Sequence, residues 1–211
     1  MRDRPAPVLQ RLTPWVWMAC ASPALWLWGA ALTDALGPNP AEALIRGLGD
    51  WTLRLLLLTL AITPLRRLLH QPLLARWRRG LGLWTAAYAS QHALAYAWLD
   101  MGLDATQLLI DVVQRPFITV GSLALLGLWA LAGTSFQRAM RWLGGERWKR
   151  LHRLVYAVAV LGVLHFYWMR AGKNDFGEVH AYTAVLALLL GLRVWWAWGA
   201  RQRDRGRSAR H

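Results

Sequence analysis

Two histidines, His92 and His165, lie inside apolar segments of the chain, where an ionisable side chain is costly and marks a candidate functional site. His92 follows Arg79 by 13 residues, and His165 follows Arg153 by 12. If both segments are helices that run in one direction from these basic starts, a rise of about 1.5 Å per residue places both imidazoles roughly 18–20 Å along them. The spacing therefore predicts two histidines at one depth.

Two imidazoles at one depth are the ligand set of a six-coordinate haem, which takes a neutral nitrogen on each side of the iron between apolar walls. The alternative is that each histidine makes a buried polar contact between helices. The single cysteine and the lack of a Cys-x-x-Cys motif support neither an intrachain disulfide nor a structural zinc site. We favour haem, with His92 and His165 as its axial ligands.

A third histidine, His152, precedes His165 by 13 residues, which is about 20 Å nearer the basic end of the same predicted helix. The position that would face it is Arg78, with Arg79 beside it. A guanidinium is a poor iron ligand and a good partner for haem propionates or phosphate groups. His152 is thus predicted to ligate a five-coordinate haem, to ligate a haem with an unusual second ligand, or only to contact an anionic cofactor.

Four further ionisable side chains fall within or beside the apolar segments. Arg54 and Arg193 are candidate partners for the carboxylates of a cofactor, and snorkelling of their guanidinium groups to the membrane interface is the alternative. His180 could line a site near the start of the last segment. His70 is expected in a solvated structural role, and His211 belongs to the C-terminal tail.

Six apolar segments carry these residues, and each is long enough for a helix that crosses a hydrocarbon core of about 30 Å. Hydrophobic residues make up 56% of the chain and charged residues 17%, which excludes an ordinary soluble protein, and 15 tryptophans are typical of membrane interfaces. We predict an all-α integral membrane bundle, one domain over residues 1–211, with spans at approximately 14–33, 48–66, 81–99, 117–136, 153–170 and 178–199.

The distribution of basic residues predicts how this bundle is oriented. Of the 25 Lys and Arg residues, 19 lie before the first segment, after the last, or in the second and fourth connections. By the positive-inside rule both termini are cytosolic, and residues 200–211 form a short, basic, disordered cytosolic tail. The first segment is expected to be a retained helix, because it is long and no clear cleavage site follows it.

The same distribution limits the classes of partner. The net charge of +14 is explained by topology and does not call for a nucleic-acid partner. The chain has no glycine-rich phosphate loop and no room for a dinucleotide fold, which excludes the usual mode of NAD(P)H binding. The three outer connections contain four basic and eight acidic residues, which predicts a basic docking patch on a partner protein.

Several runs of residues resemble a known family. They are RRGLGLW at 78–84 with Tyr88, His92 and Tyr96 behind it, RPFITVG at 115–121, Thr134 with Ser135, WKRLHRLVY at 148–156, and His165. Together they resemble the ferric-reductase-like transmembrane domain over essentially the whole chain. Within that domain family they are most similar to the MsrQ (YedZ) family, the haem-binding membrane subunits of bacterial methionine sulfoxide reductase systems.

The resemblance implies that His92, His152 and His165 ligate haem iron, with one or two haems b in each chain. Relatives with two histidines on each of the two ligand-bearing spans hold two stacked haems, whereas this chain has one histidine on its third span. The resemblance also implies FMN as a cofactor, for which no residues can be assigned. The implied electron donor is the quinone pool or a flavin reductase, and the implied acceptor is the periplasmic molybdopterin enzyme MsrP.

We therefore expect a non-catalytic electron-transfer subunit in a bacterial inner membrane, with methionine sulfoxide reduced on the partner. The arginines expected to balance propionate or phosphate charge are Arg54, Arg78, Arg79 and Arg193. One alternative is a stand-alone ferric or quinone reductase of the cytochrome b type. The other is a non-redox transporter or assembly factor, in which the histidines are only structural.

Overall fold

All regular secondary structure in the described part of the chain is helical. The computed structural model describes residues 7–172 and 174–208, and the side chains of residues 11–172 and 174–203. In chain order its elements are α1 (Pro7–Leu32), α2 (Pro40–Leu68), α3 (Leu74–Ala95), the π-helical turn η1 (Tyr96–Asp100), α4 (Ala105–Gln114), α5 (Pro116–Gly133), α6 (Gln137–Leu143), α7 (Gly145–His152), α8 (Leu154–Ala171) and α9 (Gly177–Ser208).

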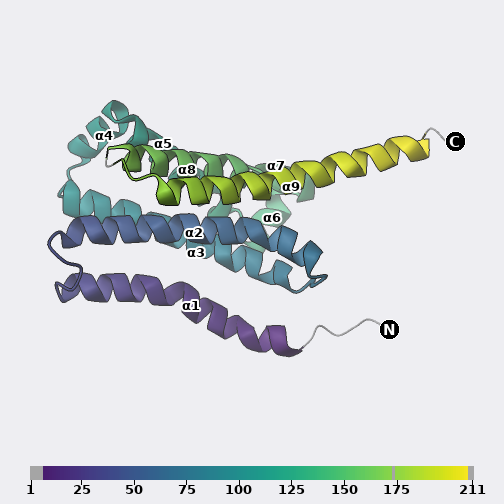
Figure 1. The fold of residues 1–211 in the computed structure, drawn as a ribbon, viewed down its shortest axis with the longest axis horizontal. Coiled ribbons are helices and arrows are strands. Elements are labelled where there is room, and N and C mark those ends of the chain that lie inside the picture. The colour runs from purple at the N-terminus through teal and green to yellow at the C-terminus, as the bar shows by residue number, and fades with distance from the viewer. Residues whose placement is uncertain (1–6, 173, 209–211) are drawn as a thin grey trace.

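The long helices run side by side and form a bundle with two distinct ends (Figure 1). Helix α2 packs mainly against α3, and α5 packs mainly against α8, while α3 contacts α5 and joins the two pairs. Helix α9 covers α2 and α8, and α1 lies on the outside against α2 and α3. Helix α4 lies at one end of the bundle, and the start of α1 and the end of α9 lie at the other (Figure 1).

Five stretches of the described chain are long and apolar enough to cross a membrane, which confirms an all-α membrane architecture. They are Arg11–Leu32, Pro40–Leu68, Pro116–Gly133, Gly145–Ala171 and Gly177–Arg203. Helix α3, which together with η1 covers the predicted third span, falls outside this set. Its first turns carry Arg76, Arg78 and Arg79 at exposed positions, which lowers its apolar content.

The helix ends differ from the predicted span ends for local reasons. Helix α2 begins eight residues before the predicted span because Asn39 caps it, with Oδ1 accepting a hydrogen bond from the Glu42 amide, and Pro40 occupies the first turn. The connection at 100–115 contains α4, which Asp104 caps by accepting from two amides. Helix α9 continues through Ser208, so the prediction of a disordered tail from residue 200 is wrong as far as Ser208, and residues 209–211 lie outside the described part.

Helix α1 is held to α3 by one deeply buried side chain. The Tyr88 hydroxyl donates to the Cys20 carbonyl at 2.7 Å and accepts from the Ala24 amide at 2.8 Å. These two backbone groups are four residues apart and would otherwise bond each other, so the hydroxyl is inserted into the hydrogen-bond ladder of α1. At Gly80 a Cβ would lie 2.1 Å from the Trp17 ring, so only glycine lets α3 approach α1 this closely.

Arg193, one of the arginines expected to bind a cofactor, donates to two backbone carbonyls. Its Nη1 donates to the Leu189 carbonyl at 2.9 Å, and its Nη2 donates to the Leu60 carbonyl of α2 at 2.5 Å. Pro64, four residues after Leu60, has no N–H, so the helix itself cannot satisfy that carbonyl in the usual way. The guanidinium replaces the missing donor and ties α9 to α2.

This contact predicts coupling between Arg193 and Pro64. Arg193→Met should lower the free energy of unfolding by about 1–3 kcal/mol, because a buried carbonyl loses its donor. In a Pro64→Ala background the new Ala amide can reach Leu60, so the same substitution should cost clearly less. Unfolding of the four proteins in mixed detergent micelles measures the difference. Equal losses in both backgrounds would contradict the coupling, and Arg201→Met, at an exposed position of α9, is the matched control.

Candidate functional site

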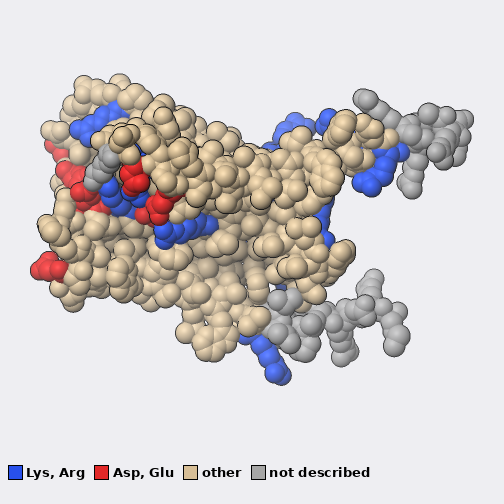
Figure 2. Space-filling view, in the orientation of Figure 1, with Lys and Arg blue, Asp and Glu red and all other residues tan. Residues whose placement is uncertain are grey.

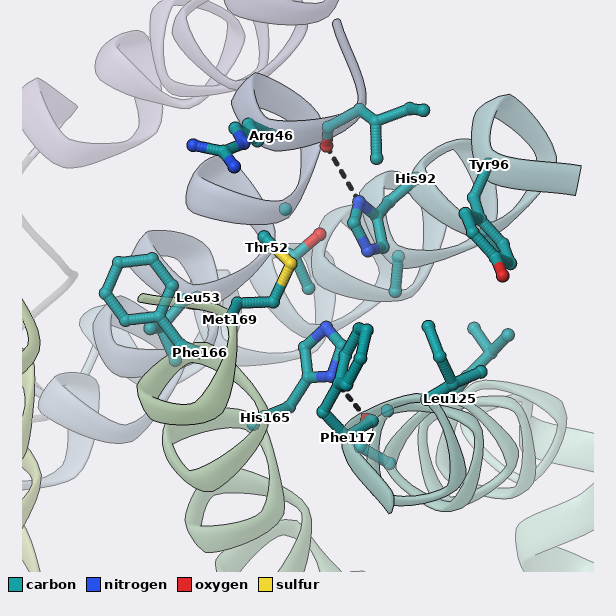
Figure 3. Close-up of a pocket in the computed structure, with 18 of the residues that line it drawn as sticks. Arg46, Thr52, Leu53, His92, Tyr96, Phe117, Leu125, His165, Phe166 and Met169 are labelled. Carbon is teal, nitrogen blue, oxygen red and sulfur yellow. Dashed lines mark hydrogen bonds between the residues drawn. The ribbon is translucent and has the colours of Figure 1, made fainter. Parts of the chain in front are cut away.

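A cavity of about 430 Å³ lies among α2, α3, α5 and α8 (Figure 3). Its deeper wall is apolar and includes Leu53, Leu56, Leu128 and Val158. At the end of the bundle that carries η1 and α4 the lining becomes charged, with Glu42, Arg46, Asp100, Arg115 and Arg170. A cavity of this size with apolar walls and a few polar groups is typical of a cofactor site.

His92 of α3 and His165 of α8 face each other across this cavity (Figure 3). Their ring centroids are 6.2 Å apart, and the ring planes make an angle of 78°. The structure thus brings together the two histidines that the sequence places at one depth.

Both imidazoles are held by backbone carbonyls of a neighbouring helix. His92 Nδ1 lies 2.8 Å from the Ile45 carbonyl oxygen of α2, and His165 Nδ1 lies 2.7 Å from the Phe117 carbonyl oxygen of α5. A carbonyl can only accept, so Nδ1 carries the hydrogen in both rings and donates it. In a neutral imidazole the lone pair is then on Nε2, which is how metal-binding histidines are commonly oriented.

The spacing of the two rings admits one metal ion. Two metal–imidazole bonds of about 2 Å each would take about 4 Å of the separation, and the rest matches the distances from each nitrogen to its ring centre. No group of three or more His, Cys, Asp or Glu side chains in the described part of the chain is placed to hold a metal. The pair therefore suits an ion that brings its other ligands with it, as haem iron does.

Comparison with known proteins decides the family. Residues 48–163 match the family described as ferric reductase like transmembrane component. The chain is 52% identical over 190 residues to the protein-methionine-sulfoxide reductase heme-binding subunit MsrQ of Polaromonas naphthalenivorans, which covers 90% of this chain and 87% of that protein. It is 53% identical over 194 residues to MsrQ of Bordetella pertussis, with 90% and 93% covered. The chain belongs to the MsrQ family. No solved structure matches it.

In this MsrQ-family chain His152 is separate from the histidine pair. Helix α7 ends at His152 and α8 begins at Leu154, with only Arg153 between them, and the two helices together form the apolar stretch Gly145–Ala171. The His152 ring stacks on Trp148 with centroids 4.1 Å apart, and its Nε2 lies 3.2 Å from the Thr134 hydroxyl.

The arginines predicted as cofactor partners do not line the cavity. Arg54 donates from Nε to the Tyr182 hydroxyl at 3.0 Å, and Arg78 and Arg79 are exposed on the first turns of α3. The Arg79 guanidinium lies over the Phe136 ring, 5.6 Å from its centroid. In this chain Arg54 and Arg193 thus bond to other parts of the protein, whereas Arg78 and Arg79 are exposed.

Three other arginines line the cavity and were missed. Arg46 pairs with Glu42 at 2.6 Å, and Arg170 donates to two carboxylates, those of Asp175 and Glu178. The third, Arg115, lies 3.3 Å from Asp111. A signal was present, because these arginines are three of the four basic residues in connections that are otherwise acidic.

The turn η1 begins with Tyr96, an aromatic residue that lines the cavity. Tyr96 lines the cavity one turn after His92 and donates from its hydroxyl to Asp111, a buried carboxylate that also pairs with Arg115. The wider π-helical turn is a common feature of functional sites, because it re-aims side chains within a helix. Here it joins α3 to α4 at the charged end of the cavity.

The buried position of Asp111 gives a testable difference between two carboxylates. Asp111→Asn should lower the free energy of unfolding by about 1–3 kcal/mol, because the buried side chain loses the negative charge that strengthens its interactions with Tyr96 and Arg115. Asp175→Asn should cost less than about 1 kcal/mol, because Asp175 is exposed and Arg170 retains its ion pair with Glu178. Unfolding in mixed detergent micelles provides the comparison, and equal losses would show that the Tyr96–Asp111–Arg115 contact contributes nothing beyond a surface pair.

Proposed function

We propose that this chain is the haem b electron-transfer subunit of a methionine sulfoxide reductase system, with His92 and His165 as the axial ligands. The observation that carries the proposal is the facing pair of imidazoles, each with Nδ1 bonded to a backbone carbonyl, in an apolar cavity. The names of the MsrQ relatives, which describe them as heme-binding subunits, support it.

The chain's own groups would bind and insulate the cofactor. His92 and His165 supply two neutral nitrogens, and the carbonyls of Ile45 and Phe117 hold the rings in the ligating tautomer. The leucine and valine walls exclude water and lower the local polarity, which are the protein's main controls over a haem potential. Haem itself supplies the one-electron redox chemistry. Reduction of methionine sulfoxide is assigned to the partner.

The proposed orientation places six spans in a bacterial inner membrane, with α3 as the additional span and both termini cytosolic. The described basic residues of α6, α7 and the end of α9 gather at the end of the bundle that carries the termini. On the face shown in Figure 2 the acidic side chains lie at the opposite end, where α4 is. The charged end of the cavity then faces the periplasm, where MsrP would accept electrons.

The direction of electron flow follows from this orientation. Electrons would enter from the quinone pool or from a flavin reductase and leave toward the periplasmic partner. FMN remains part of the proposal because relatives are expected to use it, but no group of residues is assigned to it. His152, with Arg78 nearby, is the proposed contact for an anionic cofactor or a second haem near the basic end.

Removal of the paired ligands tests the haem proposal. His92→Ala and His165→Ala should each abolish or strongly shift the b-type bands in reduced-minus-oxidised spectra, because one axial nitrogen is lost. His152→Ala should keep the bands of the main haem, since its ring lies outside the cavity. His180→Ala, at an exposed position, is the matched control. Haem should be quantified per chain, and a ratio of two would assign a second haem to His152.

The outcomes separate the proposal from its rivals. Loss of the bands in His152→Ala but not in His92→Ala would contradict the assignment of the pair. A stand-alone ferric reductase, favoured by the name of the matching family, would reduce ferric chelates steadily without a partner. A transporter or assembly factor would be colourless when purified from haem-replete cells.

The acidic outer end predicts electrostatic steering of the partner. Electron transfer from the reduced chain to MsrP should slow as ionic strength rises, because salt screens attraction between opposite charges. Asp34→Asn should slow it a few-fold at low salt; asparagine tolerates the positive φ of this position, 53°. Glu146→Gln, on the opposite end in α7, should have no effect. A rate independent of salt and of Asp34 would contradict steering.

A further inference from the structure

We infer that two glycines, Gly49 and Gly121, set the planes of the two histidine rings and thereby the electronic state of the haem iron. The inference rests on the proposed haem between His92 and His165, and it concerns how the chain orients these ligands. The glycines are positioning residues, because they act on the iron only through the imidazoles.

Each glycine lies directly against one imidazole. A Cβ built on Gly121 would lie 2.8 Å from Nδ1 and 2.9 Å from Cε1 of His165. A Cβ built on Gly49 would lie 3.1 Å from the same two atoms of His92. Both distances are shorter than ordinary contact between such atoms, so an alanine at either position would displace the imidazole ring. The displacement should be larger for alanine at position 121, where the contact is closer.

The two glycines belong to the same arrangement, which occurs twice. On α2 the Ile45 carbonyl accepts from His92 Nδ1, and Gly49 follows it by four residues, one helical turn along. On α5 the Phe117 carbonyl accepts from His165 Nδ1, and Gly121 follows by the same four residues. In each case one helix supplies the carbonyl that accepts from the ring nitrogen and, one turn along, a glycine that lies against the ring atoms Nδ1 and Cε1. The two contacts together fix the rotation of the imidazole about its Cβ–Cγ bond.

The glycines have no other evident purpose in their helices. Glycine is among the weakest helix formers, and alanine would strengthen both α2 and α5 as isolated helices. Neither glycine has a positive φ, so no turn or strained backbone requires it. What remains is the space that the missing Cβ leaves for a histidine ring.

The angle that results has a chemical consequence. The planes of the two rings are 78° apart, which is close to perpendicular. An axial imidazole overlaps best with the iron d orbital that is perpendicular to its plane. Two perpendicular imidazoles therefore interact almost equally with two d orbitals of the iron, whereas parallel imidazoles interact mainly with one of them and separate the energies of the two orbitals. The ferric EPR spectrum reports this separation directly, and the reduction potential responds to it.

Alanine substitutions test the inference in the full-length protein purified with its haem. In Gly121→Ala the largest g value of the low-spin ferric signal and the midpoint potential should both shift from those of the unchanged protein. Gly49→Ala should shift them less. If Gly121→Ala does not accumulate, Gly49→Ala, with its milder contact, decides the question.

Two matched controls separate ring orientation from packing. A Cβ on Gly127, also on α5, would lie 2.6 Å from Val158 and reach no histidine, so Gly127→Ala strains the same helix pair without turning a ligand. A Cβ on Gly82 of α3 would meet only Thr59, at 3.8 Å. Both controls should keep the original EPR signal. The inference is overturned if the haem-loaded Gly121→Ala and Gly49→Ala proteins keep that signal, or if Gly127→Ala shifts it equally. An unchanged protein without haem would instead overturn the proposed function.

Discussion

The hydrogen bond from each histidine Nδ1 to a backbone carbonyl of the next helix is the constraint on which the site depends. Backbone carbonyls in a helix interior are normally occupied, and here those of Ile45 and Phe117 also accept from an imidazole. The two bonds join α3 to α2 and α8 to α5 at the level of the cavity. They determine which nitrogen faces the cavity, and they require the two helices of each pair to stay close. The small residues along α3, such as Ala86 and Ala89, permit that approach.

The arginines at the α4 end of the bundle have different partners from the arginine within it. At the end with α4, the arginines at the cavity are each paired with carboxylates, so local charge is nearly balanced around an open polar rim. Within the bundle, Arg193 is satisfied by carbonyl oxygens, one of which a proline left without a helical donor. Both cases follow from one requirement, which is that a polar group removed from water must find its partners inside the protein.

Much of this arrangement could be predicted from the sequence, and the limits have physical causes. The depths of His92 and His165 follow from counting residues along helices, so their meeting was predictable. The single turn residue Arg153, which divides α7 from α8 directly after His152, was not, because no proline or glycine marks it. The role of Arg193 depends on Leu60 and Pro64, more than 120 residues away, and such a contact is invisible to local pattern. Gly49 and Gly121 were passed over because a glycine within an apolar helix shows nothing of the neighbour that it makes room for.

The equivalence of the two helix pairs has a consequence for reactivity. If His92 and His165 both held a haem iron, no coordination position would be left vacant for dioxygen, peroxide or a sulfoxide. Only outer-sphere transfer of electrons would remain, and the partner would need to approach the cofactor without touching the metal. The arrangement of α2 with α3 and of α5 with α8 would thus protect a reducing centre from side reactions by filling the coordination sphere from both sides.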